Sequence, residues 1–150
     1  RSGVSSTQFC VAVEEALANA FYHGNLELDS SLKQSASSTF NELVRQRCTQ
    51  SPWKDRCVCV TEVATPCGIW VIVRDEGSGY DSAAALSRDP DPYSFTESGR
   101  GLVMVKAFSD EMFFNESGNE VTLVFYPDGQ RNINRSTDQR PHALACESLQ

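Results

Sequence analysis

The sequence predicts an α/β fold of the α+β type: a two-layer sandwich with helices on one face of a mixed, mostly antiparallel β-sheet. Two observations lead to this prediction. Two helical patterns come first, two strand patterns follow, and a further helix and a β-hairpin come last. The chain has 150 residues, of which 40% are hydrophobic and 22% charged, and this suits one domain with a real core.

The first element is a helix expected over residues 7–23. Serines just before it offer N-cap oxygens, and Gly24-Asn25 provides a C-terminal stop. One face of this helix is apolar and can pack against a core. That face consists of Val13, Leu17, Ala20 and Phe21.

Another face of the same helix is polar. Glu15, Asn19 and His23 are spaced four apart, and each step of four advances about 40° beyond a full turn, so they share a face. A carboxylate beside bound phosphates could orient or deprotonate an attacking hydroxyl, and an amide oxygen suits Mg²⁺. A structural cap in the last turn is the alternative role for His23. Glu14 lies on a different face and is expected in solvent.

A second helix is expected within residues 32–50, and a strand follows at residues 56–64. Cys57 and Cys59 are expected to point the same way on this strand and to pack as small apolar groups. After a turn, the β-branched and aromatic residues 69–73 predict a central strand buried on both faces.

Residues 80–98 have little pattern of their own and are expected to form a functional lid or a disordered segment. A helix then begins at Gly99 and ends at Ser109-Asp110. Residues 111–115 and 120–126 predict a hairpin.

Charge and cysteine content narrow the function classes. The formal net charge of -7 argues against a broad nucleic-acid surface, and no apolar run approaches the length of a membrane span. The six cysteines are scattered and no signal peptide is visible, which indicates reduced thiols and a cytoplasmic protein. The spacing in Cys57-Val58-Cys59 is too short for a zinc knuckle.

The loop after the central strand is rich in glycine. Asp75 could accept a hydrogen bond from an exocyclic amine, while Gly77 and Gly79 would let the backbone approach a flat ring. A tight turn is the alternative explanation.

A second glycine pair lies at the start of the last helix. The free N–H groups and helix dipole near Gly99 and Gly101 favour phosphate, and Arg100 adds a positive charge. A flexible hinge is the alternative. The pattern is neither a Walker loop nor a Rossmann fingerprint.

In this order, the three motifs resemble those of the anti-sigma-factor serine kinases of bacteria, within the gyrase and histidine-kinase ATPase superfamily. Residues 15–20 with His23 resemble the N box of the family, and residues 75–79 resemble its first glycine box. Residues 99–102, followed by Asp110-Glu111, resemble its second glycine box.

The resemblance implies a Bergerat ATP-binding fold with ATP and Mg²⁺ as cofactors. Glu15 would be the general base, Asn19 would hold Mg²⁺, and Asp75 would bind the adenine amine. The other cofactor-binding positions that it implies are His23, Gly77, Gly79, Gly99, Arg100, Gly101 and Leu102.

For function, the resemblance implies a protein serine/threonine kinase that phosphorylates an anti-sigma antagonist and binds a sigma factor or similar partner, thereby regulating transcription. Related kinases tend to be dimers, so a homodimer is an option. One alternative is a nucleotide-gated protein-binding module with little or no kinase activity. Others are a histidine-kinase catalytic domain, for which no phosphoacceptor helix is visible, and a globular domain whose glycine loops match by coincidence.

The expected domain covers residues 1–126, and residues 127–150 form a polar C-terminal tail. Members of the family usually have a strand and a helix before the N box, and we expect both to be absent from residues 1–150. Since the chain begins at Arg1, we expect an upstream segment, for example a receiver domain. Residues 26–54 form a longer segment than in the smaller anti-sigma factors and could carry a partner surface.

Overall fold

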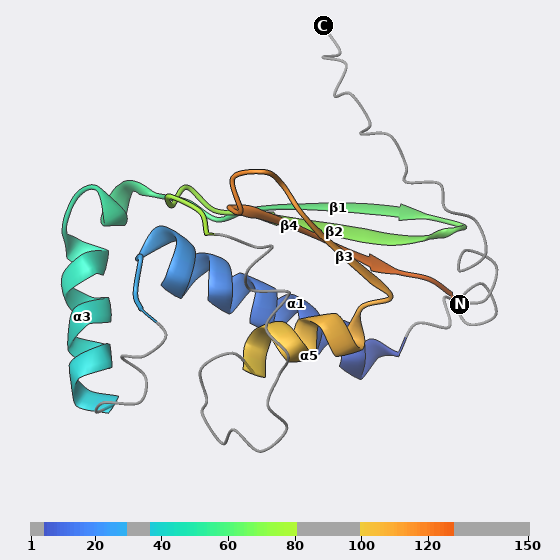
Figure 1. Cartoon of the computed structure of the whole chain (residues 1–150), viewed down its shortest axis with the longest axis horizontal. Coiled ribbons are helices and arrows are strands. Elements are labelled where there is room, and N and C mark those ends of the chain that lie inside the picture. Colours follow the sequence, from blue (N-terminus) through green and yellow to red (C-terminus); the bar gives the residue numbers. More distant parts are fainter. Residues whose placement is uncertain (1–4, 30–36, 81–99, 128–150) are drawn as a thin grey trace, which may run out of the picture.

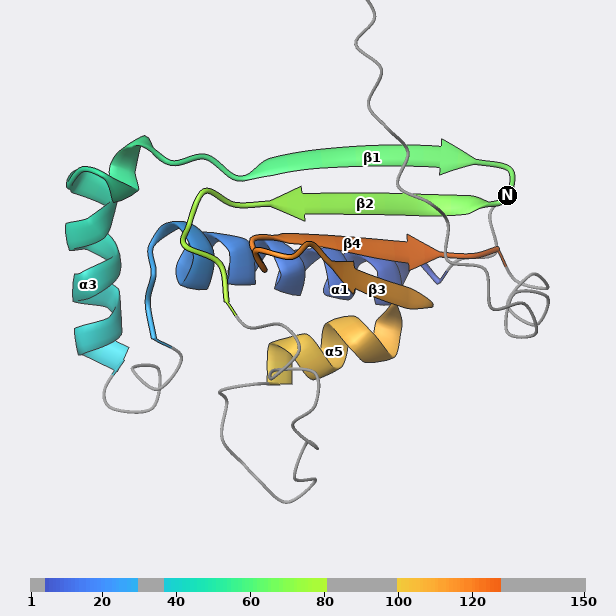
Figure 2. The same cartoon turned by 45° about the horizontal axis from the view of Figure 1, so that its top comes forward.

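The computed structural model describes residues 5–29, 37–80 and 100–127. Its strands form one antiparallel sheet in the order β1-β2-β4-β3, as Figure 2 shows. The strands are β1 (Cys59–Thr65), β2 (Gly68–Arg74), β3 (Glu111–Phe114) and β4 (Glu120–Phe125). The predicted hairpin is therefore confirmed as the pair β3 and β4.

Two helices cover one face of this sheet. In both views α1 (Ser6–Asn19) and α5 (Arg100–Phe108) lie side by side beneath the strands (Figures 1 and 2). This arrangement confirms the predicted two-layer α+β sandwich, and the three strand pairings in the described part are all antiparallel.

The core lies between α1, α5 and the sheet. Helix α1 and the first residue after it contribute alanines at a spacing of four, and their small size lets the helix lie close to the strands. The buried core residues are Ala12, Ala16, Ala20, Val71, Val73, Val105, Leu123 and Phe125. Val13 and Leu17 of the predicted apolar face pack against this core, but the prediction was wrong for Phe21, which is 38% exposed.

The first helix does not stop at the predicted residue 23. It continues as a π-helix, η1 (Ala20–Asn25), in which the N–H of Leu26 donates to Phe21 O at 2.9 Å, five residues back. Gly24-Asn25 is thus part of the helical turn rather than the stop that the sequence predicted. Because a π turn is wider than an α-helical turn, residues after Ala20 need not share a face with residues four positions earlier.

Helix α3 (Ser37–Thr49) confirms the second predicted helix, and a short 3₁₀ helix, η2 (Trp53–Asp55), follows it. Both views place α3 beyond the end of the sheet, not beneath it (Figures 1 and 2). The Arg47 guanidinium attaches α3 to the segment after η1, because Nη1 donates to Leu26 O and, at 2.7 Å, to Glu27 O.

Two predictions about burial in the sheet were wrong. Strand β2 is buried on the helix-covered face at Val71 and Val73, whereas Trp70 and Ile72 on the other face are only half-buried. Cys57 and Cys59 are exposed instead of packed. Cys59 begins β1, which lies at the sheet edge and is exposed at all seven residues, and Cys57 precedes this strand.

Some predictions fall on residues outside the described ranges, namely the lid from residue 81 onward and the tail from residue 128 onward. The five cysteines in the described part are free thiols. Within that part, no helix has the length and apolar character needed to cross a membrane.

Candidate functional site

Asp75 follows β2 and lies against bare backbone. The residue is 8% exposed, and a Cβ placed on Gly24 would lie 2.3 Å from its Cγ. A Cβ on Gly77 would lie 2.3 Å from the carbonyl oxygen of Gly24. Both positions therefore require glycine, because any side chain would displace the carboxylate or the neighbouring backbone. The result is a carboxylate in a cradle of two glycines from distant parts of the chain.

Burial raises the pKa of Asp75, because a charged carboxylate is less well solvated there than in water. The N–H of Gly77 donates to Oδ1 at 2.9 Å, and this bond and the positive charge of Arg56 partly offset the effect. Burial also raises the pKa of Tyr80 to about 12, and the charge of Asp75 adds to that shift. A partly desolvated carboxylate with specific partners is typical of a functional site.

Two asparagines hold the backbone on either side of Asp75. The N–H of Asp75 donates to Asn119 O at 3.0 Å, and Asn119 Nδ2 donates to Asp75 O at 3.2 Å. The N–H of Glu76 donates to Asn25 Oδ1 at 2.8 Å. Sequence reasoning missed both asparagines, since neither contact is visible as a local pattern.

A second cluster forms where α5 begins. A Cβ on Gly101 would lie 2.6 Å from Glu15 Oε2 and 3.6 Å from both Asn19 Oδ1 and Asn19 Nδ2. The structure therefore brings the predicted acid and amide of α1 to the predicted glycine box. The first turn of α5 has N–H groups without an intrahelical partner, and these can bind an anion.

His23 does not continue the face of Glu15 and Asn19. The π-helix begins at Ala20, and its wider turn breaks the four-residue spacing that an α-helix would maintain. His23 Nδ1 lies 2.6 Å from Leu28 O. Since a carbonyl only accepts, Nδ1 carries the proton in this bond. This geometry favours the structural role that the sequence left open.

The remaining predicted positions lie in the two glycine boxes, and the structure describes only some of them. Gly79 has a positive φ of 74°, and a Cβ there would lie 1.8 Å from Ser117 O, so contact with the β3–β4 turn already requires glycine. Leu102 is half-buried in α5. Gly99 and the side chain of Arg100 lie outside the described residues.

These residues fit MgATP. Asp75 offers a carboxylate that could accept from an exocyclic amine, and the free N–H groups at the start of α5, beside Glu15 and Asn19, suit phosphates. The described ranges contain no group of three or more His, Cys, Asp or Glu side chains that could hold a metal ion. Mg²⁺ retains much of its water and binds nucleotide phosphates, so Asn19 would be the residue to hold it, through one amide oxygen.

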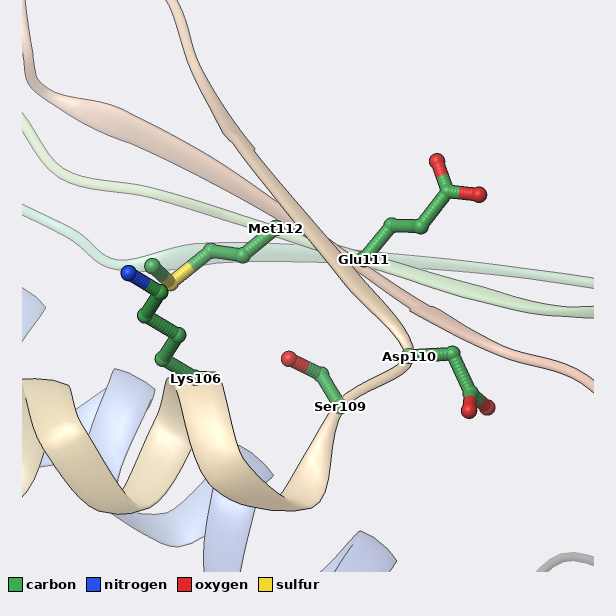
Figure 3. A pocket seen from close by; sticks show the side chains of 5 residues that line it. All are labelled: Lys106, Ser109, Asp110, Glu111 and Met112. Carbon is green, nitrogen blue, oxygen red and sulfur yellow. The ribbon is translucent and has the colours of Figure 1, made fainter. Parts of the chain in front are cut away.

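A separate hollow of about 300 Å³ lies at the other end of α5. Figure 3 shows Lys106, Ser109 and Met112 gathered around it, while the carboxylates of Asp110 and Glu111 point away. Asp110 Oδ2 accepts a hydrogen bond from the backbone N–H of Tyr126 at 2.8 Å, and Glu111 Oε1 accepts one from the Tyr126 hydroxyl at 2.8 Å. The hollow is therefore distinct from the cluster at Gly101, and two of its acids have structural roles.

Comparison with known protein families matches residues 2–125 to the histidine kinase-like ATPase domain. No curated protein and no solved structure matched the chain. The family match covers most of the chain, including both clusters described above. The chain therefore belongs to the family of histidine kinase-like ATPase domains, which bind and use ATP.

Proposed function

We propose that this domain is a protein serine/threonine kinase of the anti-sigma-factor type. It transfers the γ-phosphate of ATP to a serine or threonine of an anti-sigma antagonist, and it binds a sigma factor or a comparable partner. The observation that carries the proposal is the close contact of Gly101 with Glu15 and Asn19, because it brings an acid and an amide to the start of α5, where free helix N–H groups can bind phosphate.

The roles of the residues follow from their chemistry. Asp75 accepts a hydrogen bond from the adenine amine, and Asn19 supplies an oxygen to Mg²⁺, which neutralises phosphate charge when bound. The substrate hydroxyl oxygen forms a bond to the γ-phosphorus, the bond from that phosphorus to the ADP oxygen breaks, and Glu15 accepts the hydroxyl proton.

The test compares Glu15→Gln with the matched control Glu14→Gln, since Glu14 is the exposed neighbour on the same helix. Calorimetry with MgATP measures binding. Transfer from labelled ATP to a panel of purified anti-sigma antagonists measures activity as acid-stable phosphoprotein. We expect Glu15→Gln to bind ATP like the parent and to lose about 10²–10⁴-fold in transfer rate. Glu14→Gln should match the parent in both measurements.

Equal transfer rates in Glu15→Gln and the parent would refute the general-base role. A parent that binds ATP and transfers phosphate to no member of the panel would instead favour a nucleotide-gated binding module. An acid-labile product would favour histidine phosphorylation.

A further inference from the structure

Asn25 is a buried amide that joins two distant segments. It ends η1 and is 2% exposed, and its Oδ1 accepts a hydrogen bond from the N–H of Glu76, 51 residues along the chain. Glu76 directly follows Asp75. A buried, hydrogen-bonded amide fixes the segments that it joins, because losing the bond would leave a polar group unsatisfied. Asn25 thus fixes the loop that carries Asp75 relative to η1.

Arg56 contacts the same region. Its Nη1 donates to Asn25 O at 2.8 Å and lies 2.9 Å from Glu27 Oε1. The N–H of the next residue, Cys57, donates to Glu76 Oε2 at 2.8 Å. The segment at residues 56–57 therefore contacts both the turn that carries Asn25 and the loop that carries Glu76.

This group of contacts extends to α3 and η2. Trp53 Nε1 donates to Glu27 Oε2 at 3.1 Å, and Arg47 donates to Glu27 O at 2.7 Å. The Arg47 guanidinium also lies 4.8 Å from the centroid of the Trp53 ring, within cation–π range. The helical segment from α3 to η2 is thereby attached to the Asp75 loop through Glu27 and Arg56.

We propose that Asn25 and Arg56 are positioning residues that set the orientation of Asp75 toward the base and so determine selectivity for adenine over guanine. The inference rests on the proposed function in one respect, namely that Asp75 accepts from the adenine amine. Adenine carries an amine where guanine carries a carbonyl oxygen. A fixed carboxylate accepts a hydrogen bond from the adenine amine and repels the guanine carbonyl oxygen. A carboxylate that can turn away discriminates less between the two bases.

The experiment measures Kd for MgATP and MgGTP by calorimetry. Asn25→Leu removes the acceptor at similar volume, Asn25→Asp keeps it, and Asn41→Leu is the control at an exposed asparagine of α3. We expect Asn25→Leu to lower the preference for ATP over GTP about tenfold, as loss of one buried hydrogen bond would. Asn25→Asp should recover most of that preference, and Asn41→Leu should equal the parent. A merely structural role would weaken both nucleotides alike and leave their ratio unchanged.

Arg56→Met provides a second, independent variant should Asn25→Leu fail to fold. It should also lower the preference for ATP over GTP. Parental ratios in the folded variants of Asn25 and Arg56 would overturn the inference. Asp75→Asn separates this outcome from failure of the proposed function. If Asp75→Asn loses the preference while the other variants keep it, the positioning role is refuted and Asp75 still reads the base. If Asp75→Asn keeps the preference, Asp75 does not recognise the adenine amine, and both that role in the proposed function and the present inference are refuted.

Discussion

Asp75 is a residue at which burial and function oppose each other. Its raised pKa means that the folded protein holds the carboxyl proton more tightly than the unfolded chain does. The contribution of Asp75 to the free energy of unfolding therefore decreases as pH rises from the ordinary aspartate pKa through the raised one. At neutral pH the residue is a destabilising charge, and Gly24 and Gly77 contact it so closely that neither position has space for a side chain.

The raised pKa predicts how ATP affinity depends on pH. Affinity should fall as pH is lowered through the pKa of Asp75, because a protonated carboxyl is a poorer acceptor for the adenine amine. The fall should begin at a higher pH than the ordinary aspartate pKa of about 3.9 would give. Calorimetry from neutral to mildly acidic pH checks this, with inorganic triphosphate as the control for titration of the phosphates. Parallel pH profiles for ATP and triphosphate would contradict the prediction.

At the scale of elements, α5 serves the core and the site with different parts of its length. Gly101 in its first turn contacts the acid and amide of α1, while Val105, one turn later, is buried among core residues. Packing at Val105 thus fixes the distance between the two helices, and Gly101 makes that distance compatible with Glu15 and Asn19.

A pair of substitutions in α5 tests this packing. Val105 is 1% exposed and Val103 is 43% exposed, so the two valines differ in burial but not in chemistry. Val105→Ala should lower the free energy of unfolding by about 2 kcal/mol through lost apolar burial and the cavity left behind. Val103→Ala should change it by less than about 0.5 kcal/mol. Urea unfolding measures both, and equal losses would show that α5 does not pack as described.

At the scale of the molecule, the proposed ATP site is divided among segments far apart in the sequence. Three segments each contribute one side: helix α1 with its π turn, the loop after β2, and the start of α5. The β3–β4 turn supports the loop after β2. A ligand in this site contacts several segments that the unfolded chain does not hold together. Nucleotide binding should therefore stabilise the fold as a whole.

The expected gain follows from binding linkage. MgATP at one hundred times its Kd should raise the free energy of unfolding by about 2.7 kcal/mol at 25 °C, if the unfolded chain does not bind it. Urea unfolding with and without MgATP measures the gain. At the same nucleotide concentration, the free energy of unfolding of the Asp75→Asn variant should rise by less than that of the parent. A parent with measurable Kd and no gain would mean that the unfolded chain binds ATP as well as the folded protein does, and that the folded site is not required.

Much of this architecture could be predicted because it depends on local patterns. Apolar periodicity and glycine positions were sufficient for α3, α5 and the hairpin, and the spacing of Glu15 and Asn19 placed them on one face. The π turn could not be predicted, since i→i+5 bonding leaves no separate periodicity in the sequence. The errors at Phe21 and in the helix end, and the departure of His23 from the polar face, all occur in or beside that turn.

The remaining errors concern contacts between distant residues. Exposure of Cys57 and Cys59 depends on β1 lying at the sheet edge beyond the helices, and strand order is not encoded in a single strand. The roles of Asn25 and Asn119 depend on hydrogen bonds to a loop at least 44 residues away. Such pairs become visible only once the chain has folded.

The continuous helix from α1 through η1 also has an evolutionary consequence. Four residues lie between Asn19, which is close to Gly101, and Gly24, which is close to Asp75, and no loop lies between them to absorb a change in length. An insertion or deletion there would shift the cluster at Gly101 relative to the cluster at Asp75. Lineages of this domain should therefore keep the number of residues between Asn19 and Gly24 constant.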